Sequence, residues 1–281
     1  MPDVLILARD NKSCFDLEEL ARKHDFRVKV CMDRATAADW LKTRMFDLLL
    51  VDSSVPLYEQ QELAGLLWQA DPVAQMISFN LDAGAKINLG EARLFGAELA
   101  VGEKALPVIT SALEQIKRDS DAKQRFKSED FRIMVVEDLD SPRDIICSFI
   151  ETLGYPLVSG EHSASSAMKE LESDPGKYSC VITDIRMPEI SGKELIEFIR
   201  LHSKLQGLPV IVLTAYGTGD CLVDCLKAGA SGFLVKPPKK KDLLRELSRA
   251  IRIAAKRTSP RLASPDEADL MREILMQKGL A

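Results

Sequence analysis

The chain has 281 residues, of which 46% are hydrophobic and 29% charged, a composition typical of a globular protein with about two domains. The net charge of −5 does not indicate direct nucleic-acid binding, and no apolar run approaches the roughly 20 residues that cross a bilayer. The N-terminus lacks the basic region and the cleavage site of a signal peptide, so we expect a cytoplasmic protein without membrane attachment.

The first part of the chain alternates short apolar runs with amphipathic stretches, a pattern typical of βα units on a parallel sheet. In the run DLLLV (47–51), residues 48–51 are continuously apolar, as strands buried on both faces require. The predicted strands lie near residues 3–8, 27–31, 47–51, 74–78 and 98–101.

A charged stretch then marks a boundary. RDSDAKQRFKSED (118–130) is almost free of apolar residues and contains neither Gly nor Pro, which predicts either a linker or a helical extension. We therefore divide the chain into a first domain (1–117), this segment, a second domain (131–256) and a tail (257–281) with one expected helix.

The second domain repeats the plan of the first. Ser163 and Ser191 are predicted N-cap residues, and Ser141-Pro142 predicts an N-cap followed by a proline in the first helical position. Because Asp52 aligns with Asp184, the two halves indicate an internal duplication. The predicted strands lie at 132–136, about 156–159, 179–183, 209–213 and 232–235.

Polar side chains follow the strands of the second domain. Functional groups of such sheets gather beyond the carboxyl ends of the strands, where Glu137, Asp138 and Asp184 are expected to meet. Three carboxylates at one edge repel each other by roughly 4 kcal/mol per pair at 4 Å, so they favour a bound cation, and their hard oxygen ligands favour Mg²⁺. Lys236 adds a charge and Thr214 a hydroxyl for a phosphate oxygen. The sequence therefore predicts a phosphoryl site.

The motifs VVED (135–138), TDIRMP (183–188), LTA (213–215) and FLVKP (233–237) together resemble the receiver domain of two-component response regulators. The resemblance implies a flavodoxin-like (βα)5 fold with strand order 2-1-3-4-5, phosphorylated by a histidine kinase or a phosphotransfer protein. The implied roles are phosphoacceptor for Asp184, Mg²⁺ ligands for Glu137, Asp138, Asp184 and the Arg186 carbonyl, phosphoryl contacts for Thr214 and Lys236, and switch residues for Thr214 and Phe233.

Two large side chains lie near the implied acceptor in sequence. Arg186 is two residues beyond the acceptor, and Tyr216 is two residues beyond Thr214. Our hypothesis is that both obstruct the hydrolytic water and give the phosphoaspartate a long lifetime.

The first domain carries the acceptor position without its companions. Asp52 is in the acceptor position, but the acidic pair reads Arg9-Asp10, and the lysine position aligns with Glu103, or with Lys104 if the alignment slips by one. Ser78 is the candidate strand-four hydroxyl. We therefore expect slow or absent phosphorylation of Asp52 and a degenerate receiver kept for interaction or dimerisation.

Several alternatives stay open at the level of sequence. A Mg²⁺-dependent phosphatase of the haloacid-dehalogenase type needs a second carboxylate where Arg186 is found, so we expect a phosphoacceptor with autodephosphorylation at most and not a turnover enzyme. A phosphorylation-independent scaffold is one rival. Another is a regulatory fragment whose output domain lies beyond Ala281. Neither the cognate kinase nor the downstream partner follows from the sequence, and a homodimer is an expectation taken from the family.

Overall fold

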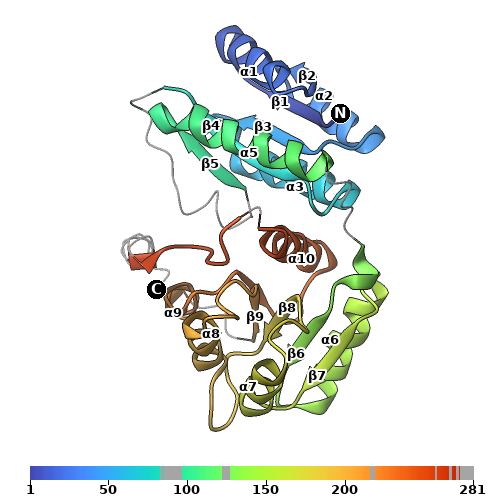
Figure 1. Cartoon of the computed structure of the whole chain (residues 1–281), viewed down its shortest axis with the longest axis vertical. Coiled ribbons are helices and arrows are strands. Elements are labelled where there is room, and N and C mark those ends of the chain that lie inside the picture. Colours follow the sequence, from blue (N-terminus) through green and yellow to red (C-terminus); the bar gives the residue numbers. More distant parts are fainter. Residues whose placement is uncertain are drawn as a thin grey trace. The chain divides into compact units, whose positions relative to one another are not determined.

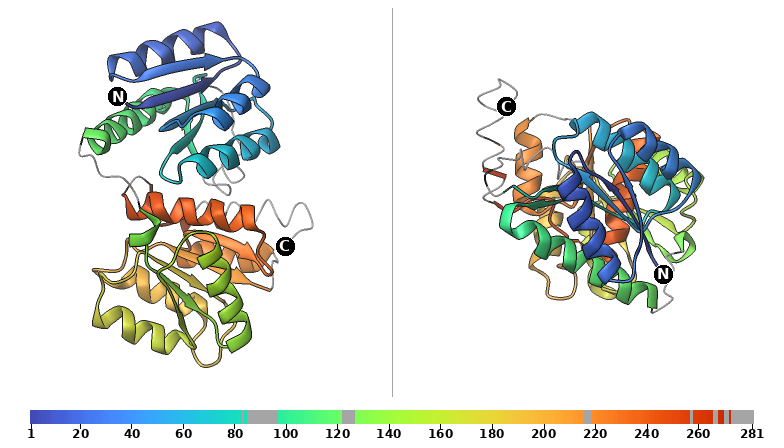
Figure 2. Two further views of the ribbon diagram at one scale, coloured as in Figure 1. Left: turned by 90° about the vertical axis from the view of Figure 1, so that its right-hand side faces the viewer. Right: turned by 90° about the horizontal axis from the view of Figure 1, so that it is seen from above.

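The computed structural model describes the chain apart from residues 83, 85–96, 122–126, 216–218, 257, 266–267, 270–271 and 273–281, and apart from the side chains of 121, 214 and 241. The chain divides into two compact units, Met1–Arg125 and Phe126–Ala281. Each unit is an α/β domain with one five-stranded parallel sheet between layers of helices (Figures 1 and 2). Within the described residues, no helix combines the length and the apolar character that a membrane span requires.

The sheet of the first unit has the order β2-β1-β3-β4-β5. Its strands are β1 (Asp3–Leu7), β2 (Arg27–Cys31), β3 (Leu48–Asp52), β4 (Gln75–Asn80) and β5 (Glu98–Val101). Its described helices include α1 (Asn11–Lys23), α2 (Arg34–Thr43), α3 (Leu57–Ala70) and α5 (Ala105–Asp121). The helix α5 continues into the predicted linker, which agrees with a helical extension as far as residue 121.

Both faces of this sheet are buried, as its continuous apolar strands predict. Successive residues of a strand point to opposite faces, and the two cores divide accordingly. On one face Leu5 packs with residues of α2 and α3, such as Leu41 and Leu63. On the other face Ile6 packs with residues of α1 and α5, such as Leu17. The apolar runs therefore determine a three-layer unit.

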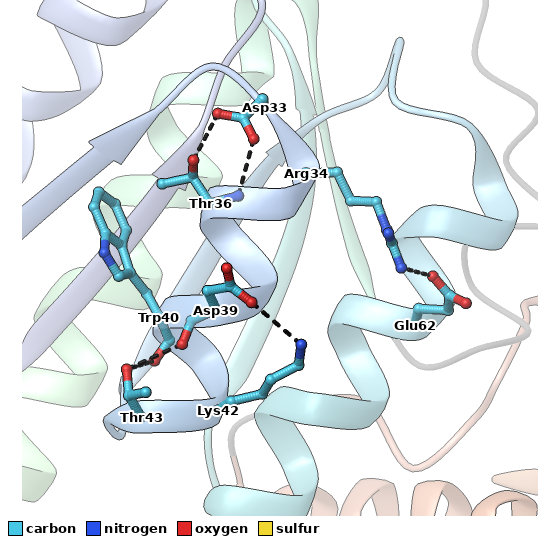
Figure 3. A network of polar contacts seen from close by, with 8 residues as sticks. All are labelled: Asp33, Arg34, Thr36, Asp39, Trp40, Lys42, Thr43 and Glu62. Carbon is cyan, nitrogen blue, oxygen red and sulfur yellow. Dashed lines mark hydrogen bonds and ion pairs between the residues drawn. The ribbon is translucent and has the colours of Figure 1, made fainter.

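Polar contacts reinforce α2 and α3 at the surface (Figure 3). Asp33 is the N-cap of α2, and its carboxylate accepts a hydrogen bond of 2.9 Å from the Thr36 amide. The next residue, Arg34, forms an ion pair through its guanidinium with Glu62 of α3. Exposed pairs of this kind contribute about 1 kcal/mol or less, so apolar packing holds the layer together.

The sheet of the second unit has the order β10-β9-β8-β6-β7, which is the predicted 2-1-3-4-5 arrangement read from its other edge. Its strands are β6 (Ile133–Val136), β7 (Val158–Glu161), β8 (Cys180–Thr183), β9 (Val210–Thr214) and β10 (Gly232–Val235). Its helices include α6 (Asp140–Thr152), α7 (Ala164–Ser173), α8 (Gly192–Leu201), α9 (Gly219–Ala228) and α10 (Lys240–Ala254). The flavodoxin-like fold predicted for both halves is confirmed.

Of the three N-cap residues predicted for the second unit, the structure confirms two. Ser163 and Ser191 are N-caps, and Ser191 forms a capping box with Glu194. The prediction for Ser141 was wrong, because α6 begins at Asp140 and has no side-chain cap. Proline is tolerated anywhere in the first turn, since those backbone N–H groups have no helical acceptor, so Pro142 did not fix the start.

Candidate functional site

The three predicted carboxylates meet at one edge of the second sheet. Glu137 and Asp138 directly follow β6, and Asp184 directly follows β8, which pairs with β6 in parallel. Parallel neighbours end at the same edge, and one ligand atom from each residue lies within 4.8 Å of the others. This geometry brings together three hard oxygen ligands, the kind of ligand set that suits Mg²⁺.

Lys236, directly after β10, supplies the positive charge of the site. Its Nζ donates to Asp184 Oδ2 at 2.8 Å and also forms an ion pair with Glu137. Burial raises the pKa of Glu137, whose side chain is 2% exposed, although Lys236 opposes the rise. Burial also disfavours the charged lysine, but its hydrogen bonds to the two carboxylates outweigh that effect and raise the pKa of Lys236. The amine is therefore held as a cation beside Asp184.

The loop after β8 fixes the main chain of Asp184. The Asp184 amide donates to the carbonyl of Val136 at 2.9 Å, and the Thr183 hydroxyl donates to the Asp184 carbonyl at 2.8 Å. The Ile185 amide donates to Asp184 Oδ1 at 2.6 Å. Gly192 lies against this loop so closely that a Cβ there would be 1.9 Å from the Asp184 carbonyl oxygen. The Asp184 carboxylate is thus positioned by a loop whose close packing only glycine permits at position 192.

Arg143 of α6 supports the acidic pair and was not singled out from the sequence. Its Nη1 donates to the Glu137 carbonyl at 2.9 Å, and its guanidinium also pairs with Asp140. The arginine stem lies over Gly160 of β7, where a Cβ would be 2.8 Å from the Arg143 Cδ. Gly160 comes directly after the strand predicted at about 156–159, and the structure includes it in β7; a glycine inside a strand often marks a close approach by another group.

For the four predicted switch and lifetime residues, the structure gives a position at most and tests no role. Thr214 ends β9 opposite Val235, but its side chain lies outside the described part, and so does the whole of Tyr216. Phe233 is half-buried and packs against the core of the second unit. Arg186 lies two residues beyond the acceptor, in the loop that leads to α8. Their roles as switch and lifetime residues stay predictions.

The strand register corrects the predicted acidic pair of the first unit. Asp52 ends β3 and Asp184 follows β8, the central strands of the two sheets. With these two aligned, the pairing of each central strand with its neighbour places Ala8 and Arg9 at the positions of the acidic pair. The predicted Arg9-Asp10 was one residue late, and the first unit has lost both carboxylates.

Asp10 has a structural role instead. Its side chain is the N-cap of α1 and accepts a hydrogen bond of 2.8 Å from the Ser13 amide, which lowers its pKa together with the side-chain hydrogen bond of Ser13. Ala8 is fully buried and offers no ligand atom. The first unit therefore uses an aspartate to start its helix where the second unit has Leu139.

The strand register also corrects the residues of the first unit that were predicted to correspond to Thr214 and Lys236. It places Asn80 and Gly102 at the positions of the predicted hydroxyl and the predicted lysine. Ser78 is buried in β4 two residues earlier, and Glu103 lies one residue beyond the lysine position. Matching the apolar motifs before β5 and β10 could not detect this shift, because register depends on side-chain packing on both faces of the sheet.

In the first unit, Asp52 consequently lacks the neighbouring acidic pair, hydroxyl and lysine that correspond to those around Asp184. Its carboxylate accepts hydrogen bonds from the amides of Ser54 at 2.9 Å and Arg9 at 3.4 Å. Over the described ranges, the cluster around Asp184 is the one group of three or more candidate metal ligands. The register therefore replaces Glu137, Asp138, Thr214 and Lys236 of the second unit with other residues in the first.

Comparisons with known proteins concern mainly the second unit. Residues 133–248 match the family model described as response regulator receiver domain. The chain is 30% identical over 106 residues to the chemotaxis protein CheY of Pseudomonas aeruginosa, covering 38% of this chain and 84% of that protein. It is 32% identical over 119 residues to the two-component response regulator ORR11 of Oryza sativa subsp. indica, covering 42% and 80%. Among solved structures, chemotaxis protein CheY4 of Vibrio cholerae matches with 25% identity and a TM-score of 0.39, covering 43% of this chain and 98% of that one.

Proposed function

The chain belongs to the response regulator receiver family through residues 133–248, and from this premise we propose that Asp184 accepts a phosphoryl group from a histidine kinase or a phosphotransfer protein. The observation that carries the proposal is the meeting of three carboxylates and one lysine at one sheet edge. In this reading the protein is a phosphoacceptor that changes its protein contacts and not a turnover enzyme.

The donor set fits a magnesium ion. Glu137, Asp138 and Asp184 offer carboxylate oxygens close together, and the Arg186 carbonyl is the fourth proposed ligand. Mg²⁺ prefers such oxygens and commonly shares its coordination with phosphate. When bound, it would neutralise charge on the transferred phosphoryl group.

The residues of the chain then have separate tasks in the transfer. The Asp184 carboxylate attacks phosphorus, so that a P–O bond forms while the P–N bond of the donor phosphohistidine breaks and the imidazole leaves with the electron pair. The Ile185 amide fixes one carboxylate oxygen, which limits the orientations of the nucleophile. Lys236, already 2.8 Å from the carboxylate, can move to a phosphoryl oxygen by a small rotation of its side chain.

The later steps follow the family expectation. Thr214 would contact the phosphoryl group and Phe233 would change its packing, so that the partner preference of the α9–β10–α10 face changes. A shift from about 1% to 99% of the active state needs about 5.5 kcal/mol of differential stabilisation. Arg186 and Tyr216 would then slow hydrolysis, which predicts faster decay of the phosphoaspartate in Arg186→Asn.

The first unit is proposed as a degenerate receiver that serves contacts with other proteins or with a second copy. The support is the strand register, which puts Ala8, Arg9 and Gly102 at the positions of two metal ligands and the lysine. Without two metal ligands and the lysine, the charge that would develop at Asp52 lacks the compensation proposed for Asp184. A phosphorylation-independent scaffold is the rival function, and the first unit alone fits it.

The test is intact mass of the full chain after incubation with Mg²⁺ and a small-molecule phosphodonor. One added phosphoryl group that is lost in Asp184→Asn and kept in Asp52→Asn is the expected result. Size-exclusion chromatography of the same samples detects a change of oligomeric state. If no sample gains a phosphoryl group and none binds Mg²⁺, the scaffold function replaces the present proposal.

A further inference from the structure

The segment after α10 returns to the second unit and lies against α9 (Figure 1). Hydrogen bonds fix its first part. The Leu262 amide donates to the carbonyl of Ala230 at 2.8 Å, and Arg200 Nη2 donates to the carbonyl of Pro260 at 3.2 Å. The Ser231 hydroxyl donates to the same Pro260 carbonyl. The tail is therefore bound through its main chain to the turn between α9 and β10.

The buried side chain of Arg200 of α8 connects the tail to the second unit. The side chain is 8% exposed and donates to the carbonyls of Gly229 at 2.8 Å and Leu208 at 2.7 Å as well as to Pro260. Burial lowers its pKa to about 10, and the charge of Arg261 adds to that effect. A buried guanidinium needs acceptors for its N–H groups, and one of them belongs to the tail.

Gly229 provides room for the tail. Its φ of +103° suits glycine, and a Cβ there would be 2.7 Å from Nη1 of Arg261 and 2.9 Å from the Cγ of Arg200. A side chain at this position would require the guanidinium of Arg261, which belongs to the tail, and the stem of Arg200 to shift. The turn is thus shaped for the chain that passes over it.

Ion pairs fix the second part of the segment along α9. Arg272 lies 2.7 Å from a carboxylate oxygen of Asp224 and 3.7 Å from one of Asp220, and Asp269 pairs with Lys227. The acidic residues of α9 thus pair with an arginine of the tail, and the lysine of α9 pairs with an aspartate of the tail. The order of these pairs shows that the tail runs antiparallel to α9. Because α9 carries charges of both signs and they are matched by opposite charges of the tail, the ion pairs select one register and one orientation of the tail on α9.

We propose that α9 and the turn 229–231 form a peptide-docking surface, and that its occupant is this chain's own segment after α10, of which the structure describes residues 258–265, 268, 269 and 272. The segment closes the surface to other proteins, and a partner that binds there must carry an acid and a base three residues apart, as Asp269 and Arg272 are. The contacts that carry this proposal are those of the unphosphorylated chain, and its test uses no phosphodonor, so it and the test of the proposed function fail or succeed separately.

The first experiment is hydrogen exchange of the full chain, read at residues 258–265. In Arg272→Glu two attractions become repulsions, and we expect exchange of this stretch to rise about fivefold or more. The double variant Lys227→Glu with Asp269→Lys should exchange like the wild type, while each of its single variants exchanges faster. The control is Lys193→Glu, which changes an ion pair of α8 (3.8 Å to Glu197) outside the tail contact.

The second experiment measures binding of a labelled synthetic peptide of residues 258–272 by fluorescence anisotropy. A tethered segment competes at an effective concentration of the order of mM, so the wild type should bind the peptide at least about tenfold more weakly than Arg272→Glu. Equal exchange in the wild type and Arg272→Glu, or equal peptide binding by the two, overturns the proposal. Dimers held by exchanged tails would overturn the intramolecular assignment, because the occupant would then be a second copy.

Discussion

Gly192→Ala tests how tightly the loop that follows β8 and contains Asp184 is packed. The new Cβ would lie 1.9 Å from the carbonyl oxygen of Asp184 and 3.0 Å from the hydroxyl of Thr183. Carbon atoms in contact prefer about 3.5–4.0 Å, so the loop or the start of α8 must move by at least about 1 Å. That movement also strains the hydrogen bond of 3.0 Å from the Gly192 amide to the Ile185 carbonyl. Overpacking and the weakened hydrogen bond together should destabilise the second unit by about 2–3 kcal/mol.

The assay separates the two units. Both tryptophans, Trp40 and Trp68, lie in the first unit, so their fluorescence follows that unit during urea unfolding, while hydrogen exchange of β8 follows the second. We expect a lower stability in β8 and an unchanged tryptophan transition, with a melting temperature lower by about 5–10 °C for the second unit. Gly207→Ala is the matched control, since a Cβ there meets nothing within 4 Å. If Gly192→Ala is as stable as Gly207→Ala, the steric argument for this loop is refuted.

Three further predictions follow from single contacts. Arg143→Ala removes the donor to the Glu137 carbonyl and should weaken Mg²⁺ binding, measured by calorimetry, about tenfold, whereas Arg143→Lys should keep most of the affinity. Ser191→Ala removes the capping box of α8 and should cost about 1 kcal/mol in chemical denaturation; an unchanged midpoint would contradict the cap. Burial raises the pKa of Tyr155 from 10 to about 12, so the folded state holds this proton more tightly, and about 2 kcal/mol of stability should be lost as the pH rises from 10 to 12. Tyr155→Phe should remove that loss.

Local signals were sufficient for the fold and for the main site. Continuously apolar strands at regular spacing predict a parallel sheet buried on both faces, and the chemistry at the strand ends then follows from topology. Glu137, Asp184 and Lys236 could therefore be placed together without coordinates. Ser163 and Ser191 could be recognised as caps, because an N-cap acts on amides only two or three residues away.

The tertiary structure decided what depends on distant packing. The first unit differs from its prediction by one residue at Arg9 and at Glu103, because register is fixed by the fit of side chains against helices on both faces of the sheet and not by local motifs. The supporting arginines, Arg143 and Arg200, bind main-chain carbonyls, which leave no trace in the sequence. For the same reason the contacts of Asp269 and Arg272 with α9 became visible only in the folded chain, where charges some 45 residues apart in sequence meet.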